Sequence, residues 1–310
     1  MSALSAAYFN NENEARKLLE ELRWNGEPVC PHCGGLKHYQ TKKAGVYRCG
    51  EPECRKDYSV TTASVMERSH IKLHKWLAAF YLMCSSKKGI SAHQLHRTLG
   101  ITYKSAWFMA MRIREAMREG GLLPPLGGSG KIVEADETYF GKPKVARVSP
   151  QRKGRPYLKG DKRRNDRPIV SLVERGGKVR SFHVPTATKE NVARIVMGNI
   201  RHESRLHTDE SRLYTGAKAV FAAHERVNHS RGVYAYKDIT TNTVEGYFSI
   251  FKRGMRGVYQ HCSEKHLHRY LAEFDFRFNN RIALGTDDGA RAALAMKGIA
   301  GKRLTYRQPH

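Results

Sequence analysis

The chain has 310 residues, with 55 Lys and Arg against 29 Asp and Glu, so its formal net charge is +26. This length, with 40% hydrophobic residues, predicts two or three folded domains and excludes a wholly disordered chain. The positive charge favours a polyanionic partner such as nucleic acid, although charge can also serve solubility alone. Because the sequence has neither an apolar run of 18 residues nor a secretory signal pattern, we expect a cytoplasmic protein.

The first predicted element is an amphipathic helix over residues 12–24, which ends before Pro28. Residues 28–60 then carry few large apolar side chains among Gly, Pro and Lys, so they cannot build a core of their own. The same stretch holds four of the six cysteines. Because metal binding can supply about 10 kcal/mol or more to such a segment, a metal site is expected here.

The four cysteines form two pairs, the first separated by two residues and the second by four. Zinc takes four thiolates tetrahedrally, and four protein ligands leave no open position for catalysis. We therefore expect one structural Zn²⁺ bound by Cys30, Cys33, Cys49 and Cys54. A histidine, His32 or His38, in place of one thiol is the alternative. Cys84 and Cys262 fall in apolar helical patterns and are expected to be buried thiols.

Residues 89–117 predict two helices joined by a tight turn at Gly100, with Ser91 and Thr102 as their N-caps. This is the pattern of a helix-turn-helix, whose second helix enters the major groove by its N-terminal residues. The residues expected to contact DNA are Tyr103, Lys104 and Ser105 at the bases, with Arg112 and Arg114 nearer the phosphates. An ordinary helical hairpin is the alternative.

A linker rich in Gly and Pro follows at residues 124–130, and the pattern then changes to that of an α/β domain. Strands are expected over residues 131–136, 168–175 and 178–184, a short strand ends at Asp209, and helices cover 188–200 and most of 241–281. Gly176 and Gly177 predict a hairpin between the second and third strands. The apolar stripe of the last helix is interpreted as core packing against the sheet.

The segment 142–167 carries eleven Lys or Arg against two Asp. We expect a solvated loop in the free protein that becomes ordered against phosphates. The DNA contacts predicted here are Lys153, Arg155, Arg163 and Arg164.

Three carboxylates stand out in the α/β part. Asp136 and Asp209 are each placed at a strand end, and Glu245 lies on a helix. Three such groups gathered in one place repel each other unless divalent cations bridge them, and Mg²⁺ prefers oxygen ligands. The neighbouring acidic residues Glu134, Glu137 and Glu210 are expected to face away, because adjacent strand residues point to opposite faces. His207 and His224 are interpreted as surface or packing residues.

The order of these features resembles the insertion-sequence transposases that join a zinc ribbon to an RNase H-like DDE domain, the ISXO2-like group. After the zinc ribbon and the helix-turn-helix come VEADETYFG, the basic loop, HTDES, TNTVEGYFSIFKRG and HLHRYLAEFDFRFNNR, so the resemblance covers residues from about 10 to 285. Asp209 and Glu245 are 36 positions apart, close to the D,D(35)E spacing, and Lys252 follows Glu245 by seven.

The resemblance implies four regions: an N-terminal helix and zinc ribbon over 1–62, a helix-turn-helix domain over 63–123, an RNase H-like catalytic domain over 124–285, and a C-terminal helix and tail over 286–310. It further implies that Asp136, Asp209 and Glu245 bind two Mg²⁺ ions, with Mn²⁺ as a substitute, and that Lys252 contacts DNA. Asn242, which is near Glu245 in the sequence, is an alternative third ligand.

The function implied is that of a transposase in a prokaryote, associated with chromosomal or plasmid DNA. It would bind the terminal inverted repeats of its element as a homodimer and catalyse Mg²⁺-dependent strand cleavage and strand transfer. The partners would be double-stranded DNA at the element ends and at the target. Two alternatives stay open: a DNA-binding regulator with an inactive catalytic domain, and an RNase H-like nuclease that joins nothing.

Overall fold

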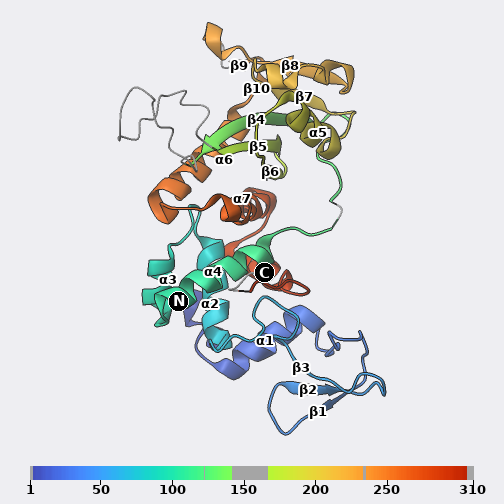
Figure 1. The fold of residues 1–310 in the computed structure, drawn as a ribbon, viewed down its shortest axis with the longest axis vertical. Coiled ribbons are helices and arrows are strands. Elements are labelled where there is room, and N and C mark those ends of the chain that lie inside the picture. Colours follow the sequence, from blue (N-terminus) through green and yellow to red (C-terminus); the bar gives the residue numbers. More distant parts are fainter. Residues whose placement is uncertain (1–2, 122, 142–166, 233–234, 306–310) are drawn as a thin grey trace, which may run out of the picture. The chain divides into compact units, whose positions relative to one another are not determined.

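The computed structural model describes residues 3–121, 123–141, 167–232 and 235–305 (Figure 1). The chain forms two compact units, the first made of Met1–Glu119 with Asn280–His310 and the second of Gly120–Asn279. Within the described ranges, no helix is both long and apolar enough to cross a membrane.

The first unit begins with the predicted helix α1 (Glu12–Trp24), which is capped by Asn11. It is followed by a three-stranded antiparallel sheet whose strands are β1 (His38–Gln40), β2 (Val46–Cys49) and β3 (Asp57–Ser59). Trp24, at the end of α1, packs edge-on against Tyr47 and Tyr58, with ring centroids 5.8 and 5.9 Å away. The helix therefore supplies apolar cover that the small sheet lacks.

Four more helices complete this unit: α2 (Leu73–Ser85), α3 (Ala92–Leu99), α4 (Tyr103–Met117) and α8 (Asp288–Lys297). α8 packs against α2, and Arg291 donates a hydrogen bond to the carbonyl of Cys84 at 3.0 Å. Lys302 likewise donates to the carbonyl of Ala116 at 3.0 Å. Residues at both ends of the chain thus build one folded unit.

The turn between α3 and α4 forms as the sequence predicts. Ser91 accepts from the amide of Gln94 at 3.1 Å, and Thr102 accepts from that of Ser105 at 3.2 Å, so both N-caps are confirmed. Gly100 adopts a φ of +58°, a left-handed conformation that glycine reaches at little cost.

The second unit is built on a five-stranded sheet with the order β6-β5-β4-β7-β8. Its strands are β4 (Ile132–Phe140), β5 (Arg167–Glu174), β6 (Val179–His183), β7 (Arg205–Thr208) and β8 (Ala223–Arg226). β5 pairs antiparallel with β4 and β6, whereas β7 runs parallel to β4 and to β8. The predicted hairpin between β5 and β6 is confirmed, but β4 runs through Asp136 to Phe140 instead of ending at the aspartate.

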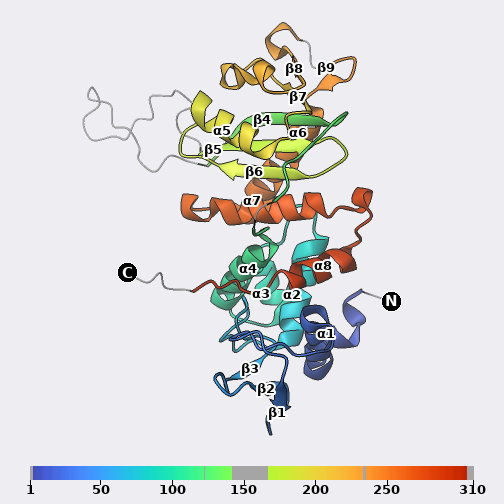
Figure 2. The ribbon, with the colours of Figure 1, turned by 90° about the vertical axis from the view of Figure 1, so that its right-hand side faces the viewer.

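Helices cover both faces of this sheet (Figure 2). α5 (Lys189–Asn199) covers one face, where Val133 and Ala135 of β4 join a core with Val192 and Val196 of α5. The helices α6 (Asn242–Gly254) and α7 (Glu264–Asn279) contact β4 and β6, respectively. One turn of π-helix, Met255–Tyr259, follows α6, and a small hairpin of β9 (Ala235–Tyr236) and β10 (Ile239–Thr240) precedes it.

The alternation along β4 decides which residues meet α6. Odd-numbered positions of β4 face α5, so the even-numbered Glu134 and Asp136 face the α6 side. The apolar stripe expected on the helix that ends near residue 281 is also confirmed. This helix is α7, and its residues Leu267, Leu271 and Phe274 are buried.

Candidate metal centres and DNA-contacting surface

The four predicted cysteines come together in the first unit. Each sulfur of Cys30, Cys33, Cys49 and Cys54 lies within 4.8 Å of the others. The Sγ atoms of Cys30 and Cys54 are 3.8 Å apart, and those of Cys33 and Cys49 are 3.5 Å apart. Four thiolates at about 2.3 Å from one Zn²⁺ would be about 3.8 Å from each other, so the donor set fits a tetrahedral zinc.

Main-chain hydrogen bonds shape both cysteine turns. In the first, Gly34 donates to the carbonyl of Cys30 at 2.8 Å, and the amide of Cys30 donates to Gly35 at 3.0 Å. In the second, Cys54 donates to Glu51 at 3.1 Å, which closes a turn across the four-residue gap. The alternative ligand His38 has its Nδ1 2.9 Å from the carbonyl of Leu36 and is engaged there.

The N-terminal turn of α4 presents two of the predicted DNA contacts to solvent. Tyr103 is 45% exposed and stacks on His93 of α3 with ring centroids 4.2 Å apart. Lys104 is exposed and Ser105 is half-buried. The stacking holds the Tyr103 ring at the surface, where an aromatic face is available to another molecule.

The arginines farther along α4 are differently placed. Arg112 is half-buried, donates to the carbonyl of Glu67 at 3.1 Å and lies 4.5 Å over the ring of Phe108. Arg114 is only 2% exposed, so the expectation that it lies near phosphates is wrong. Arg114 lies on the face of α4 that packs against the rest of the unit, so its side chain is buried although it is charged.

In the second unit, Asp136 and Asp209 lie together as expected, joined by Glu137. One carboxylate oxygen of each lies within 4.8 Å of the other two. Asp136 comes from the middle of β4, while Asp209 directly follows β7, the parallel neighbour of β4. β7 ends just before Asp209, whereas β4 continues past this point. The carboxylates of Asp136 and Asp209 can therefore lie together beyond the end of β7.

The expectation that Glu137 faces away is wrong. Its carboxylate accepts hydrogen bonds from the hydroxyl of Tyr214 at 2.9 Å and from that of Ser211 at 3.3 Å. Ser211 also donates its amide to Asp209 at 2.9 Å. The turn after β7 therefore holds the Glu137 carboxylate near Asp209, beyond the end of β7.

The pKa of each of the three carboxyl groups is raised, in each case first by burial. Burial, together with the charges of Glu137 and Asp209, raises the pKa of Asp136 to about 8. Burial and the charge of Asp209 raise the pKa of Glu137, and burial also raises that of Asp209. A cluster of oxygen donors that repel one another is the donor set that a hard divalent cation such as Mg²⁺ would bind.

Adding Mg²⁺ is expected to raise the melting temperature more at pH 8.5 than at pH 6. In the metal-free protein the raised pKa of Asp136 favours the protonated folded state, so stability falls as the pH rises through about 8. Mg²⁺ competes with that proton, and at saturation we expect a rise of about 5 °C at the higher pH. Calorimetry with NaCl matched for ionic strength measures it, and an equal rise at both pH values would contradict the site.

Glu245, the third predicted ligand, lies in the first turn of α6 and outside the 4.8 Å group. Its Oε1 accepts a hydrogen bond from the hydroxyl of Thr241 at 2.7 Å and lies 3.6 Å from Nε2 of His229. It is near enough to add to the electrostatic repulsion at both Asp136 and Asp209. Its side chain is 46% exposed, so it is open to solvent on the side that other groups leave uncovered.

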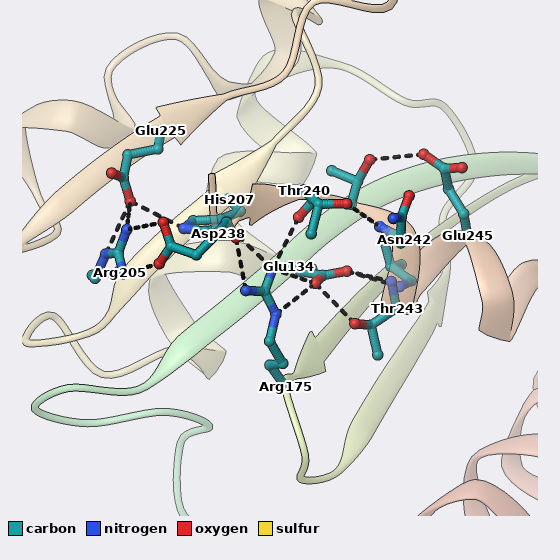
Figure 3. A network of polar contacts seen from close by, with 12 residues as sticks. Glu134, Arg175, Arg205, His207, Glu225, Asp238, Thr240, Asn242, Thr243 and Glu245 are labelled. Atoms are coloured by element: carbon teal, nitrogen blue, oxygen red, sulfur yellow. Dashed lines mark hydrogen bonds and ion pairs between the residues drawn. The ribbon is translucent and has the colours of Figure 1, made fainter. Parts of the chain in front are cut away.

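Glu134 does not face away either. It is completely buried and bonds to the first turn of α6, as Figure 3 shows. Its position two residues before Asp136 was the available signal, since residues i and i+2 of a strand share a face. His207, interpreted as a packing residue, is also buried and is hydrogen-bonded to Glu225.

The remaining predictions concern two cysteines outside the zinc cluster and the basic residues expected to contact DNA. Cys84 is buried, but Cys262 is only half-buried, because it lies in the connection before α7 and not within a helix. Lys252 is half-buried on α6. The other predicted DNA contacts, Lys153, Arg155, Arg163 and Arg164, lie outside the described residues.

Comparison with known proteins finds family matches in both units. Residues 10–57 match a family described as a transposase zinc-ribbon domain. An uncharacterized protein in the transposable element ISH50 of Halobacterium salinarum is 28% identical over 285 residues, which are 87% of this chain and 91% of that protein.

Two solved structures overlap the chain more weakly. The simian T-cell lymphotropic virus intasome in complex with PP2A regulatory subunit B56 gamma has a TM-score of 0.28 at 17% identity, over 58% of this chain and 63% of that chain. The Mos1 transposase paired-end complex with left transposon end has a TM-score of 0.30 at 14% identity, over 72% and 74%. Sequence carries the assignment instead: residues 125–279, half of the chain, match the family described as an ISXO2-like transposase domain, and the protein belongs to that family.

Proposed function

We propose that this protein is a transposase that cuts DNA at the ends of its element and joins those ends to target DNA. The observation that carries the proposal is the meeting of Asp136 and Asp209 at one edge of the sheet, with Glu245 nearby, in a chain of net charge +26. The strand order, in which only β5 opposes the other four, supports an RNase H-like domain.

Asp136, Asp209 and Glu245 would hold two Mg²⁺ ions. When bound, such ions activate the attacking oxygen and stabilise the leaving oxygen of a phosphodiester. These side chains would position the scissile phosphodiester for two successive displacements. In the first, water breaks the P–O bond at the element end and frees a 3′ hydroxyl. In the second, that hydroxyl attacks a target phosphodiester, so a new P–O bond joins the element end to the target and the cut target strand leaves with a 3′ hydroxyl.

DNA recognition would belong mainly to the first unit. Tyr103, Lys104 and Ser105 at the start of α4 would read bases of the terminal repeat, and the zinc ribbon would add to this surface. Arg112, the basic loop 142–167 and Lys252 would contact phosphates. Because two ends must be brought together for transfer, the active complex would be a homodimer.

Binding to terminal-repeat DNA is expected to weaken steeply with salt. About eight phosphate contacts predict a log-log slope of affinity against salt near −7. Fluorescence anisotropy from 50 to 300 mM NaCl, in the absence of Mg²⁺, measures the slope. A nearly flat response would show that the positive charge serves another purpose.

One experiment separates the proposal from its alternatives. The purified chain is incubated in Mg²⁺ with duplexes that contain or lack an element end, and nicked and joined products are resolved. A transposase gives both products only with the end-containing duplex. Specific binding without cleavage would indicate a regulator, and cleavage without joining would indicate a nuclease.

A further inference from the structure

The first turn of α6, which carries Glu245, is held on the sheet by one buried carboxylate. Oε2 of Glu134 accepts hydrogen bonds from the amides of Thr243 at 2.8 Å and Val244 at 3.0 Å, and Oε1 accepts one from the Thr243 hydroxyl at 2.9 Å. A helix leaves such N-terminal amides without intrahelical partners. Thr241, at the N-cap position, donates its hydroxyl to Glu245 instead. Glu134 therefore does from β4 what an N-cap side chain does elsewhere.

Arg175 supplies the charge that balances Glu134. Its Nε and Nη2 atoms donate to Oε1 of Glu134 at 3.0 and 2.8 Å. The same guanidinium donates to the carbonyls of Asp238 at 2.8 Å and Thr240 at 3.2 Å, in the hairpin that leads into α6 (Figure 3). A buried carboxylate without such a partner would be strongly destabilising. Helix, hairpin and strand are thus fixed at one point.

The strand register extends this contact across the sheet. Glu134, His207 and Glu225 are direct neighbours on β4, β7 and β8. Nε2 of His207 lies 3.0 Å from Glu225, and its Nδ1 lies 3.4 Å from Nη2 of Arg175. Because Glu225 can only accept and Arg175 can only donate, the His207 ring donates from Nε2 and accepts at Nδ1. At the end of this series of contacts, Nη2 of Arg205 donates a hydrogen bond to Oε2 of Glu225 at 2.6 Å.

This contact lies next to the acidic cluster. Glu134 and Asp136 are two residues apart on β4 and share the face that α6 contacts. The place of the first α6 turn is therefore set directly beside Asp136. We propose that Glu134, paired with Arg175, is a positioning residue that sets where Glu245 stands relative to Asp136 and Asp209. The inference rests on the metal-binding role of Glu245 given under the proposed function.

The test replaces Glu134 by Gln in the full chain. The Gln carbonyl can still accept from the helix amides, but its NH₂ group faces the donors of Arg175, so the contact loosens without a large change in volume. We expect Mn²⁺ titration by calorimetry to show one of two ions bound about 10- to 100-fold more weakly. Hydrogen exchange should be faster at the amides of Thr243 and Val244.

A double-variant cycle shows whether Glu134 acts through Glu245. Glu245→Gln alone is expected to weaken the same ion, and adding Glu134→Gln should weaken it no further. Val196→Ala, a core change in α5, is the matched control and should lower the melting temperature while leaving Mn²⁺ affinity unchanged. Thr243→Val removes a single hydrogen bond to Glu134 and gives a smaller effect in the same direction if Glu134→Gln fails to fold.

The outcomes separate the inference from the proposed function. Unchanged Mn²⁺ binding in Glu245→Gln would overturn the metal-binding role of Glu245. With that role intact, normal Mn²⁺ binding in Glu134→Gln, or weakening that adds fully to that of Glu245→Gln, would overturn the positioning role alone.

Discussion

Replacing Asp136 by Asn is expected to lower the rate of DNA strand cleavage by more than about 10³-fold, or about 4 kcal/mol of transition-state stabilisation. The change removes one of the carboxylates that would hold Mg²⁺, beside Glu137 and Asp209, while keeping the size of the side chain. Single-turnover nicking of an end-containing duplex measures the loss. Binding to the same DNA should be unchanged, because the base contacts proposed for α4 lie in the other unit.

The same variant carries its own control for folding. At pH 8 without metal, Asp136→Asn should melt no lower than the unmodified chain, because it removes one of three repelling carboxylates. A variant that is stable, binds DNA and no longer nicks would assign the loss to chemistry. Residual cleavage above about one tenth of the normal rate would refute the role of Asp136.

Replacing Cys49 by Ser is expected to have the second largest effect. Cys49 is fully buried, and its sulfur completes the four-thiol cluster. Zinc binding supplies about 10 kcal/mol or more to a ribbon of this kind, so the variant should lose both the ion and the ordered sheet β1-β2-β3. Metal analysis should fall from one zinc per chain to none, and hydrogen exchange over residues 28–60 should approach that of an unfolded chain.

Cys84→Ser is the matched control for this change, because Cys84 is equally buried but lies on α2, outside the cluster. It should keep one zinc per chain and a protected ribbon. A Cys49→Ser protein that retains the full zinc content would show that the ion is bound by another ligand set.

Local rules were sufficient where a single segment decides its own structure. The helices at residues 12–24 and around Gly100 followed from apolar spacing and from side chains able to cap them, and the β5–β6 hairpin followed from two glycines. The four-cysteine cluster was equally predictable, because the short spacing within each pair keeps its two sulfurs close together.

The remaining features depend on how separate segments meet. Glu137 joins the acidic cluster only because the turn after β7 brings Ser211 and Tyr214 to it, and no spacing along the chain reveals that turn. Arg114 is buried because of the helix face it occupies in the assembled unit. The contact of Glu134 with α6 joins residues about 110 positions apart, so only the fold could show it.

The first unit is discontinuous, since residues from 280 onward pack with residues 1–119, and this affects synthesis on the ribosome. Val65 donates to the carbonyl of Ile299 at 3.2 Å, and Gly301 donates to that of Ala63 at 2.9 Å. A nascent chain therefore cannot complete the first unit until α8 has emerged, long after α3 and α4. Truncation at residue 119 would remove the packing of α8 against α2 and α4.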